Sequence, residues 1–423
     1  MTVELEPALG DALRAAARRF GTPAYVTNLA TLEAACLAVN EAFPDPIVRQ
    51  YSVKANDVPA IIAEVARRGF GANVVSRGEW ALARRAGVPD ERITLEGVGK
   101  TPADLVAAAR AAADGHPLRW VAVESPEEAR ALADAARRAG APPLDVLYRL
   151  NPDVTPETQP GLAVGAGGSK FGMTETEIAD AIEAGGGPNG PLRSRGLQVH
   201  VGSQLGAVDA WRDGARKAVA LTALWRGSIE TFDTVDLGGG MPIRPVGEPA
   251  PDPAHFAREL PAILASVPEE RRPSRVAIEP GRALVARAGW LVARVLHVRE
   301  RGGRQVVLDA GMTELIRPAL YGARHPIVAL TSLGRAVDVG GTASAPGTPA
   351  RVEGPVCEST DSLGDHDLPP LRRGDLVAIA DAGAYATSLG STYNGRPRPP
   401  QVLLETDGGL RLGRRRGTVA SLA

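Results

Sequence analysis

The stretch VRQYSVKANDVPAIIAEVARRGFGANVV, residues 48–75, decides the fold. A β-branched and aromatic run from Val48 to Val53 predicts a strand, and an amphipathic stretch from Pro59 to Arg68 predicts a helix. Proline suits the first turn of that helix, and Gly69 suits the position just past its end. The chain then returns to a short apolar run, Ala72 to Val75. A strand, a helix and a second strand in this order form one unit of a parallel sheet.

The same alternation continues to about residue 285 and gives eight units in all. The predicted strands are Val48 to Val53, Ala72 to Val75, Ile93 to Leu95, Arg119 to Val123, Asp145 to Leu150, Ser194 to Val199, Thr234 to Asp236 and Arg275 to Ile278. Eight successive units predict a closed (β/α)8 barrel of the TIM type, which we place at residues 31–288.

The helical period fades after Gly289, and a second, mostly β domain is expected at residues 289–423. Its predicted strands are Leu291 to Arg299, Gln305 to Leu308, Leu376 to Ala380 and Gln401 to Leu404. We expect the N-terminal segment, residues 1–30, to pack with this domain. The predicted fold class is therefore α/β, a barrel with a C-terminal β domain.

Composition argues against a nucleic-acid-binding, a membrane-spanning and a disulfide-rich protein. The 423 residues include 48 Lys and Arg against 49 Asp and Glu, so no net field would attract nucleic acid or an anionic membrane, and a small-molecule substrate is expected. No apolar run reaches the 18 residues of a membrane span, and Glu4, Glu6 and Asp11 occupy the start, where a signal peptide would be basic and then apolar. Two cysteines, Cys36 and Cys357, make no disulfide framework. A cytoplasmic location is expected.

Chemically distinctive residues follow four of the predicted barrel strands. Lys54 follows the first, His200 the sixth, three glycines (Gly238 to Gly240) the seventh, and Glu279 with Arg282 the eighth. Each has an ordinary structural explanation when taken alone: a solvated lysine, a core histidine, a tight turn and a salt bridge. Together they lie on the carboxyl rim, where barrel enzymes build their active sites.

This combination indicates pyridoxal 5′-phosphate as the cofactor. The cofactor's aldehyde needs an amine such as Lys54, its ring nitrogen an acidic partner such as Glu279, and its phosphate a glycine-rich loop. The sequence Gly97 to Thr101 resembles the end of a phosphate-binding P-loop but lacks the first glycine, which would stand at Thr94, so we predict no nucleotide site there.

A thiol stands beside a carboxylate at Cys357 and Glu358 in the second domain. The thiol is a candidate proton donor, and the carboxylate is a candidate partner for a substrate amine. A metal site through Cys357, Asp361 and His366 meets no standard ligand spacing, so no metal is predicted.

The chain resembles the fold type III pyridoxal-phosphate-dependent decarboxylases, and among them the diaminopimelate decarboxylases. The resemblance covers nearly the whole chain in order: YSVKAN (51–56), residues 69–80, LNPD (150–153), SKFGM (169–173), HVGSQ (200–204), DLGGG (236–240), EPGR (279–282), RPALY (317–321), CESTD (357–361), DAGAY (381–385) and YNGRPRP (393–399). It implies decarboxylation of meso-2,6-diaminopimelate to L-lysine and CO₂, in lysine biosynthesis.

The resemblance also implies a role for each matching residue. Lys54 would bind the cofactor covalently, His200 would stack on its ring, and Glu279 would meet its ring nitrogen. The phosphate would be held by Ser203, Gly239, Gly240, Gly281, Arg282 and Tyr385, and the substrate by Arg282, Arg317, Tyr321, Glu358 and Tyr385. Cys357 would protonate the substrate carbon, from the other subunit of a homodimer with shared active sites.

Four stretches depart from the family pattern: Asn73 replaces an aspartate, Gly97 to Lys100 replace Gly-Asn-Asn-Lys, residues 155–168 lack a His and a Thr-Gly, and residues 241–251 lack a tyrosine. Three alternatives therefore stay open. They are a decarboxylase of another amino-acid-like substrate in siderophore or antibiotic biosynthesis, an amino acid racemase, and a cofactor-binding protein without activity.

Overall fold

The computed structural model describes residues 5–243, 250–337 and 347–422. Residues 244–249, inside the stretch from Met241 to Pro251 named above, lie outside this description. The chain divides into two compact units. The barrel unit comprises residues 36–243 and 250–283, and the sheet unit comprises residues 5–35, 284–337 and 347–422. Among the described helices, none combines the length and the apolar character that crossing a lipid bilayer requires.

Eight parallel strands close the barrel in chain order. They are β2 (Val48–Ser52), β3 (Gly71–Val74), β4 (Ile93–Leu95), β5 (Trp120–Val123), β6 (Leu144–Leu150), β7 (Leu192–Val199), β8 (Thr234–Asp236) and β9 (Arg275–Ile278). The ring closes where β9 pairs with β2, with Val48 opposite Ala277. All eight predicted strands are present, each within two residues of its predicted ends, and the predicted fold class is confirmed.

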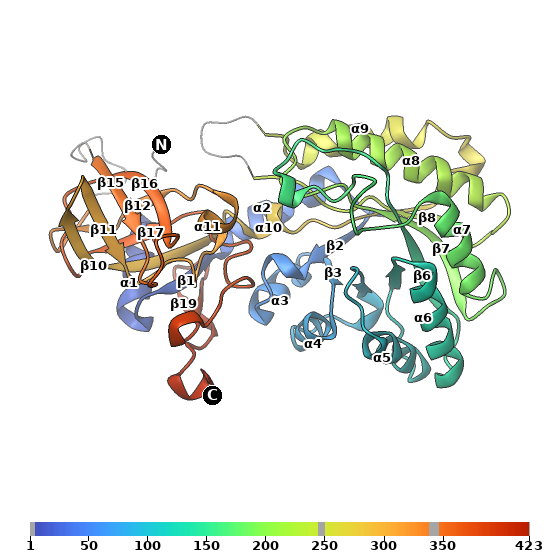
Figure 1. Cartoon of the computed structure of the whole chain (residues 1–423), viewed down its shortest axis with the longest axis horizontal. Helices are drawn as coiled ribbons and strands as arrows, with labels where there is room; N and C mark the ends of the chain where they lie inside the picture. Colours follow the sequence, from blue (N-terminus) through green and yellow to red (C-terminus); the bar gives the residue numbers. More distant parts are fainter. Residues whose placement is uncertain (1–4, 244–249, 338–346, 423) are drawn as a thin grey trace. The chain divides into compact units, whose positions relative to one another are not determined.

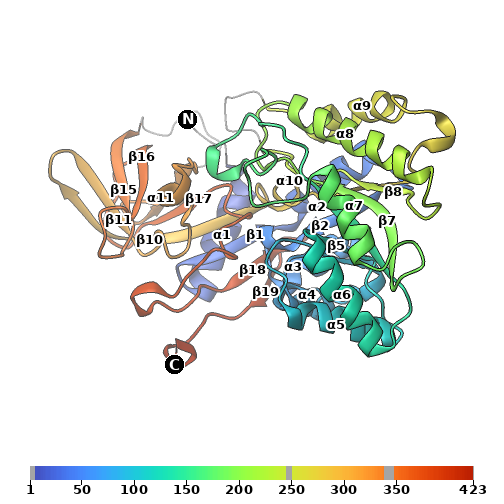
Figure 2. The ribbon, with the colours of Figure 1, turned by 45° about the vertical axis from the view of Figure 1, so that its right-hand side comes forward.

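Seven helices connect these strands and surround them (Figures 1 and 2). They are α3 (Pro59–Arg67), α4 (Arg77–Arg85), α5 (Pro102–Ala113), α6 (Pro126–Ala139), α7 (Glu175–Ala184), α8 (Asp209–Arg226) and α9 (Pro253–Leu264). Local sequence fixes where they begin: α3, α5, α6 and α9 have proline in the first turn, and α5 begins with a capping box of Thr101 and Asp104. Helix α2 (Leu29–Ala42) precedes the first barrel strand, and α10 (Arg282–Val285) follows the last.

The sheet unit is built on the long strand β10 (Gly289–Glu300), which pairs with β1 (Ala24–Asn28), β11 (Arg304–Leu308) and β17 (Leu376–Ile379). The other strands of the sheet are β12 (Ile327–Ala329), β15 (Thr348–Glu353), β16 (Ser362–Leu368), β18 (Gln401–Leu404) and β19 (Leu410–Arg414), and β13 (Thr331–Ser332) forms a small hairpin with β14 (Arg335–Ala336). Helices α1 (Pro7–Phe20) and α11 (Arg317–Tyr321) complete the unit.

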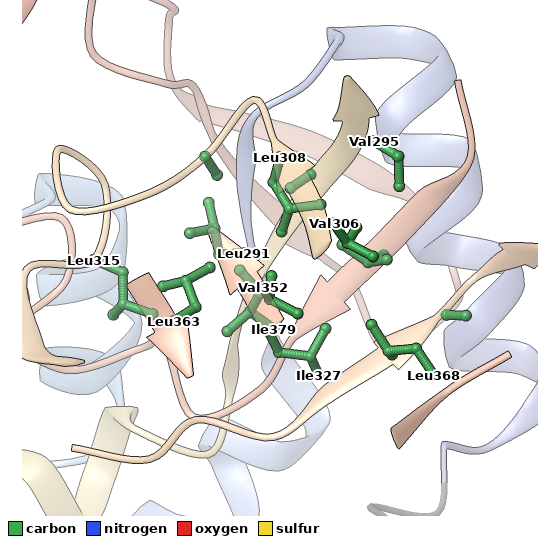
Figure 3. Packing of buried hydrophobic residues seen from close by; sticks show 14 of the residues in the cluster. Leu291, Val295, Val306, Leu308, Leu315, Ile327, Val352, Leu363, Leu368 and Ile379 are labelled. Carbon is green, nitrogen blue, oxygen red and sulfur yellow. The ribbon is translucent and has the colours of Figure 1, made fainter. Parts of the chain in front are cut away.

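Aliphatic side chains from several strands fill the core of the sheet unit (Figure 3). Leu291 of β10, Val306 of β11, Val352 of β15 and Ile379 of β17 all belong to one fully buried cluster. Burying such side chains is the main stabilising contribution to a sheet of this kind. Two loops leave this sheet, residues 309–316 after β11 and residues 354–361 between β15 and β16.

Candidate active site

Lys54 lies in a single 3-10 turn, Val53–Ala55, directly after β2. Its neighbours Val53 and Ala55 are fully buried, and the Tyr51 hydroxyl donates to the carbonyl of Asn56 at 3.0 Å, which fixes the turn. Burial raises the pKa of Glu79 and Glu96 and lowers that of His200, and the positive charge of Lys54 also acts on all three groups, so its amine lies near them. The structure therefore places this lysine on the carboxyl rim of the barrel, beside several other ionisable groups.

The three glycines after β8 occupy positions that tolerate no side chain. A Cβ at Gly238 would lie 2.4 Å from the carbonyl oxygen of Val199, and one at Gly239 would lie 2.4 Å from that of Glu279. Gly238 and Gly240 also have positive φ angles of 67° and 102°, which favour glycine. The loop thus brings its backbone against the ends of the two neighbouring strands, β7 and β9.

His200 follows β7 and meets this glycine loop. The N–H of Gly239 donates to Nδ1 of His200 at 3.1 Å. Burial and the charges of Lys54 and Arg149 hold the pKa of His200 well below its usual 6.5. The imidazole is therefore a neutral, flat ring whose orientation the glycine loop fixes.

Glu279 follows β9 and is buried. Its Oε1 accepts a hydrogen bond from Nε2 of Gln198 at 2.8 Å. Two further buried carboxyls, those of Glu96 and Asp236, lie close to it, with oxygens of all three within 4.8 Å of one another. Burial first, and then the neighbouring carboxyls, raise the pKa of both Glu96 and Asp236 well above the usual range.

Arg282 and Ser203 form a cationic corner of the same rim. Nη2 of Arg282 donates to the Ser203 hydroxyl at 3.0 Å, and Arg282 is buried. A Cβ at the preceding Gly281 would lie 3.0 Å from the Cβ of Ser52, so the chain passes close to the end of β2. A guanidinium beside a hydroxyl is a suitable partner for a phosphate group.

Two residues that the sequence analysis did not single out also reach this rim. Arg149, in β6, donates from Nη1 to Glu124 at 2.5 Å, and the second oxygen of Glu124 accepts from the N–H of Gly172 at 2.9 Å. The ring of Phe171 lies 4.8 Å from the Arg149 guanidinium. This buried ion pair fixes the SKFGM segment to the barrel. The sequence could have indicated Arg149 and Glu124 only by their positions, since Arg149 lies near the end of β6 and Glu124 follows β5.

The remaining predicted residues belong to the sheet unit. Cys357 and Glu358 are exposed, and Glu358 accepts a hydrogen bond from the Tyr393 hydroxyl at 2.6 Å. Arg317 is buried and its charge acts on Asp381, while Tyr321 and Tyr385 are half-buried. The motifs CESTD and YNGRPRP thus meet within this unit.

Asp361 anchors the loop that carries the thiol. Its two carboxylate oxygens accept from the N–H groups of Met312, at 2.6 Å, and Val356, at 2.7 Å. A Cβ at Gly354 would lie 2.2 Å from one of these oxygens, so the glycine is needed for the anchor. Asp361 therefore accepts hydrogen bonds from backbone donors in its own loop and in the loop of residues 309–316.

Comparison with known proteins shows the family. The family described as "Pyridoxal-dependent decarboxylase, pyridoxal binding domain" matches residues 29–286. The chain belongs to the pyridoxal-dependent decarboxylases. It is 34% identical to a diaminopimelate decarboxylase of Aquifex aeolicus over 96% of this chain and 92% of the relative. It is 39% identical to one of Actinosynnema pretiosum over 96% of this chain and 89% of the relative.

A solved relative has the same fold over its whole length. The crystal structure of diaminopimelate decarboxylase from Helicobacter pylori complexed with L-lysine superposes with a TM-score of 0.86 at 29% identity, covering 97% of this chain and 98% of that one. The resemblance inferred from the sequence is confirmed, as are the enzyme class and the cofactor of this family, pyridoxal 5′-phosphate.

The residues on the barrel rim fit that cofactor. Lys54 supplies a primary amine and Glu279 supplies a buried carboxylate. Arg282 and Ser203 supply donors for a phosphate, and the glycine loop provides a surface that any Cβ would fill. The N–H of Gly239 already donates to His200, so we expect the N–H of Gly240 to be the main donor of this loop to the phosphate.

Proposed function

We propose that this protein decarboxylates meso-2,6-diaminopimelate to L-lysine and CO₂. The observation that carries the proposal is the barrel rim, where Lys54, His200, Gly239 and Glu279 follow one another in a chain of close approaches. The relatives of nearly equal length, which are diaminopimelate decarboxylases, support the choice of substrate.

Each rim residue has a role toward the cofactor. Pyridoxal 5′-phosphate, when bound, supplies an electron-withdrawing ring that accepts the electron pair left behind when the substrate carboxylate departs as CO₂. Lys54 provides the amine for its aldehyde. The carboxylate of Glu279 would favour a proton on the ring nitrogen, and the neutral imidazole of His200 would cover one face of the ring. Arg282, Ser203, Gly240 and Gly281 would bind the phosphate, together with Tyr385.

The substrate has an ammonium and a carboxylate group at each end, and we assign recognition of the end that does not react to charged and polar residues of complementary chemistry. Arg282 and Arg317 match a carboxylate, Glu358 matches an ammonium group, and Tyr321 and Tyr385 complete the set. Tyr393 supports this assignment, since its hydroxyl orients Glu358. A substrate with a single carboxylate, which leaves as CO₂, would have no second carboxylate for Arg282 and Arg317 to bind.

Cys357 is assigned as the acid that delivers a proton to the substrate carbon after CO₂ leaves. The thiol is exposed on the sheet unit, which suits a role in an active site shared with a second copy of the chain. We therefore infer a homodimer in which each site combines the barrel of one subunit with Cys357 and Glu358 of the other. The predicted cytoplasmic location stays a prediction.

A substrate comparison tests the proposed function. Purified protein supplied with pyridoxal 5′-phosphate should release CO₂ from meso-diaminopimelate much faster than from L-lysine, L-ornithine or L-arginine. Lys54→Ala protein, which lacks the amine for the cofactor, is the negative control for CO₂ release. Chiral chromatography of L-alanine and L-lysine incubated with the enzyme tests the racemase alternative. Equal or absent release from diaminopimelate, with release from another substrate, would overturn the assignment.

A further inference from the structure

Three buried carboxyl groups meet at the carboxyl ends of the barrel strands. Glu96 follows β4, Asp236 ends β8 and Glu279 follows β9, so the three come from strands that are not all neighbours. All are buried, with exposed fractions of 5%, 0% and 4% in that order, and oxygens of the three lie within 4.8 Å of one another. We call these three residues the carboxyl cluster.

Each member accepts one hydrogen bond from a neutral donor. Nδ2 of Asn73 donates to Oε2 of Glu96 at 2.9 Å, and the N–H of Gly238 donates to Oδ1 of Asp236 at 2.9 Å. Nε2 of Gln198 donates to Oε1 of Glu279 at 2.8 Å. The other oxygens of Glu96 and Asp236, Oε1 and Oδ2, are buried and face no donor among the described residues.

Protonation of two of the carboxyls would remove both the charge repulsion within the cluster and the lack of donors for the buried oxygens. Three like charges at this separation and depth repel too strongly for all three carboxyls to ionise. A buried carboxylate oxygen without a donor is also unfavourable, whereas a protonated carboxyl is itself a donor. Glu279 lies within hydrogen-bonding reach of both Glu96 and Asp236, so it is the natural acceptor for two such protons.

We propose that Glu96 and Asp236 are protonated positioning residues that donate to Glu279, leaving Glu279 as the single ionised carboxyl that faces the cofactor's ring nitrogen. This rests on the proposed function for the role of Glu279, while the protonation states stand on the cluster alone. With donors from Gln198, Glu96 and Asp236, the Glu279 carboxylate is held in one orientation by hydrogen bonds. The ring nitrogen of a bound cofactor would then face one fixed negative charge, which would favour its protonated form.

The proposal gives Asn73 a function. Its amide supplies the N–H that the carbonyl oxygen of a protonated Glu96 accepts, and an aspartate at position 73 would add a fourth acid without a donor. The charges of Glu279, Asp236 and Lys54 act on Glu96, and that of Glu279 acts on Asp236. The position of Lys54 favours keeping one negative charge in the cluster, because that charge balances the ammonium.

Amide substitutions test these protonation states. In Glu96→Gln the amide oxygen can still accept from Asn73 and the NH₂ can still donate toward Glu279, so the bonding of a protonated acid is reproduced. Asp236→Asn does the same between Gly238 and Glu279. Both variants should bind pyridoxal 5′-phosphate within about twofold of the wild type and keep the pH dependence of its visible absorbance. Glu279→Gln should weaken binding about tenfold or more and shift that pH dependence, because it removes the ionised member.

Infrared spectroscopy supplies a direct readout that does not depend on turnover. The holoenzyme should show two carboxylic-acid C=O contributions at neutral pH. One should be lost in Glu96→Gln and the other in Asp236→Asn, and both should persist in Glu279→Gln. Glu96→Leu, which keeps the bulk but removes the donor, should lose affinity for the cofactor where Glu96→Gln does not. If Glu96→Leu does not fold, the infrared comparison of the amide variants still decides.

Two results would overturn the proposal. One is a change of the absorbance profile in Glu96→Gln or Asp236→Asn as large as that in Glu279→Gln, because the altered member would then be ionised. The other is stabilisation of the wild type by added Mg²⁺ or Mn²⁺ that Glu96→Gln abolishes, which would make the cluster a cation site. Failure of the proposed function would instead appear as lack of CO₂ release from diaminopimelate with the infrared result intact.

Discussion

Gly239 donates its backbone N–H to Nδ1 of His200 at 3.1 Å, so the glycine loop and the histidine form one unit of the site. The bond requires a lone pair on Nδ1, which places the ring proton of the neutral imidazole on Nε2. His200→Phe keeps a flat ring but leaves the buried Gly239 donor without an acceptor. We expect binding of pyridoxal 5′-phosphate to weaken about tenfold, measured by equilibrium dialysis. His297→Phe, at an exposed position, is the control, and equal affinities would refute the coupling.

The lowered pKa of His200 predicts how stability depends on pH. In the unfolded chain this imidazole takes up a proton near pH 6.5, whereas the folded ring does so only at lower pH. The unfolded state therefore binds more protons below pH 6.5, and the free energy of unfolding should fall as the pH drops from about 6.5 toward 5. Urea denaturation of the wild type and His200→Phe checks this. The wild type should lose more stability than the variant over that range, and parallel curves would contradict the prediction.

Lys54 is predicted to be the only amine that binds the cofactor covalently. Lys54→Arg keeps the positive charge beside Glu79 and Glu96 but offers no primary amine, so it should fold normally and bind the cofactor only reversibly. Decarboxylation should fall about a thousandfold or more. Borohydride reduction followed by peptide mass spectrometry should label Lys54 in the wild type and no lysine in the variant. A labelled lysine elsewhere in Lys54→Arg would show that the assignment is wrong.

The barrel was predictable because its signals are local. The run from Val48 to Val53 and the helix from Pro59 to Arg68 carry their own periodicity and end signals. The sheet unit was predicted less completely. Strand β16 (SLGDHDL) buries only Leu363 and Leu368 among polar neighbours, and β12 to β14 are too short to show any period. Their pairing depends on partners that are distant in sequence.

The site was predictable where a strand end alone identifies a residue, as for Lys54, His200 and Glu279. The carboxyl cluster was not, because Glu96 and Asp236 look like ordinary polar residues until closure of the barrel buries them together. Lys100 shows the converse: it resembled part of a phosphate loop, and its amine in fact bonds Glu128 at 2.9 Å and the carbonyl of Gly97.

Asp361 should matter for stability and for activity through the loop that it anchors. Asp361→Asn turns one acceptor into an NH₂ group that faces either the Met312 or the Val356 N–H, so one buried backbone donor loses its partner. We expect a loss of about 2 kcal/mol in the free energy of unfolding and a lower kcat, because the same loop carries Cys357 and Glu358. Urea denaturation and CO₂ release check both, with exposed Asp365→Asn as the matched control. Unchanged stability would refute the anchoring role.

The last prediction concerns Cys357 and the dimer. If the thiol protonates the substrate carbon, Cys357→Ala should bind the cofactor as the wild type does and lose turnover, because the thiol acts after cofactor binding. If it also belongs to the neighbouring subunit's site, mixing inactive Lys54→Ala with inactive Cys357→Ala should restore activity. Random exchange makes about half of the dimers mixed, each with one intact site of two, so activity should recover to about a quarter of the wild type. Mixing Lys54→Ala with Lys54→Arg is the control, since no arrangement of those chains contains an intact site. Subunit exchange is verified with two affinity tags, and exchange without recovery would place Cys357 in the site of its own chain or outside the site.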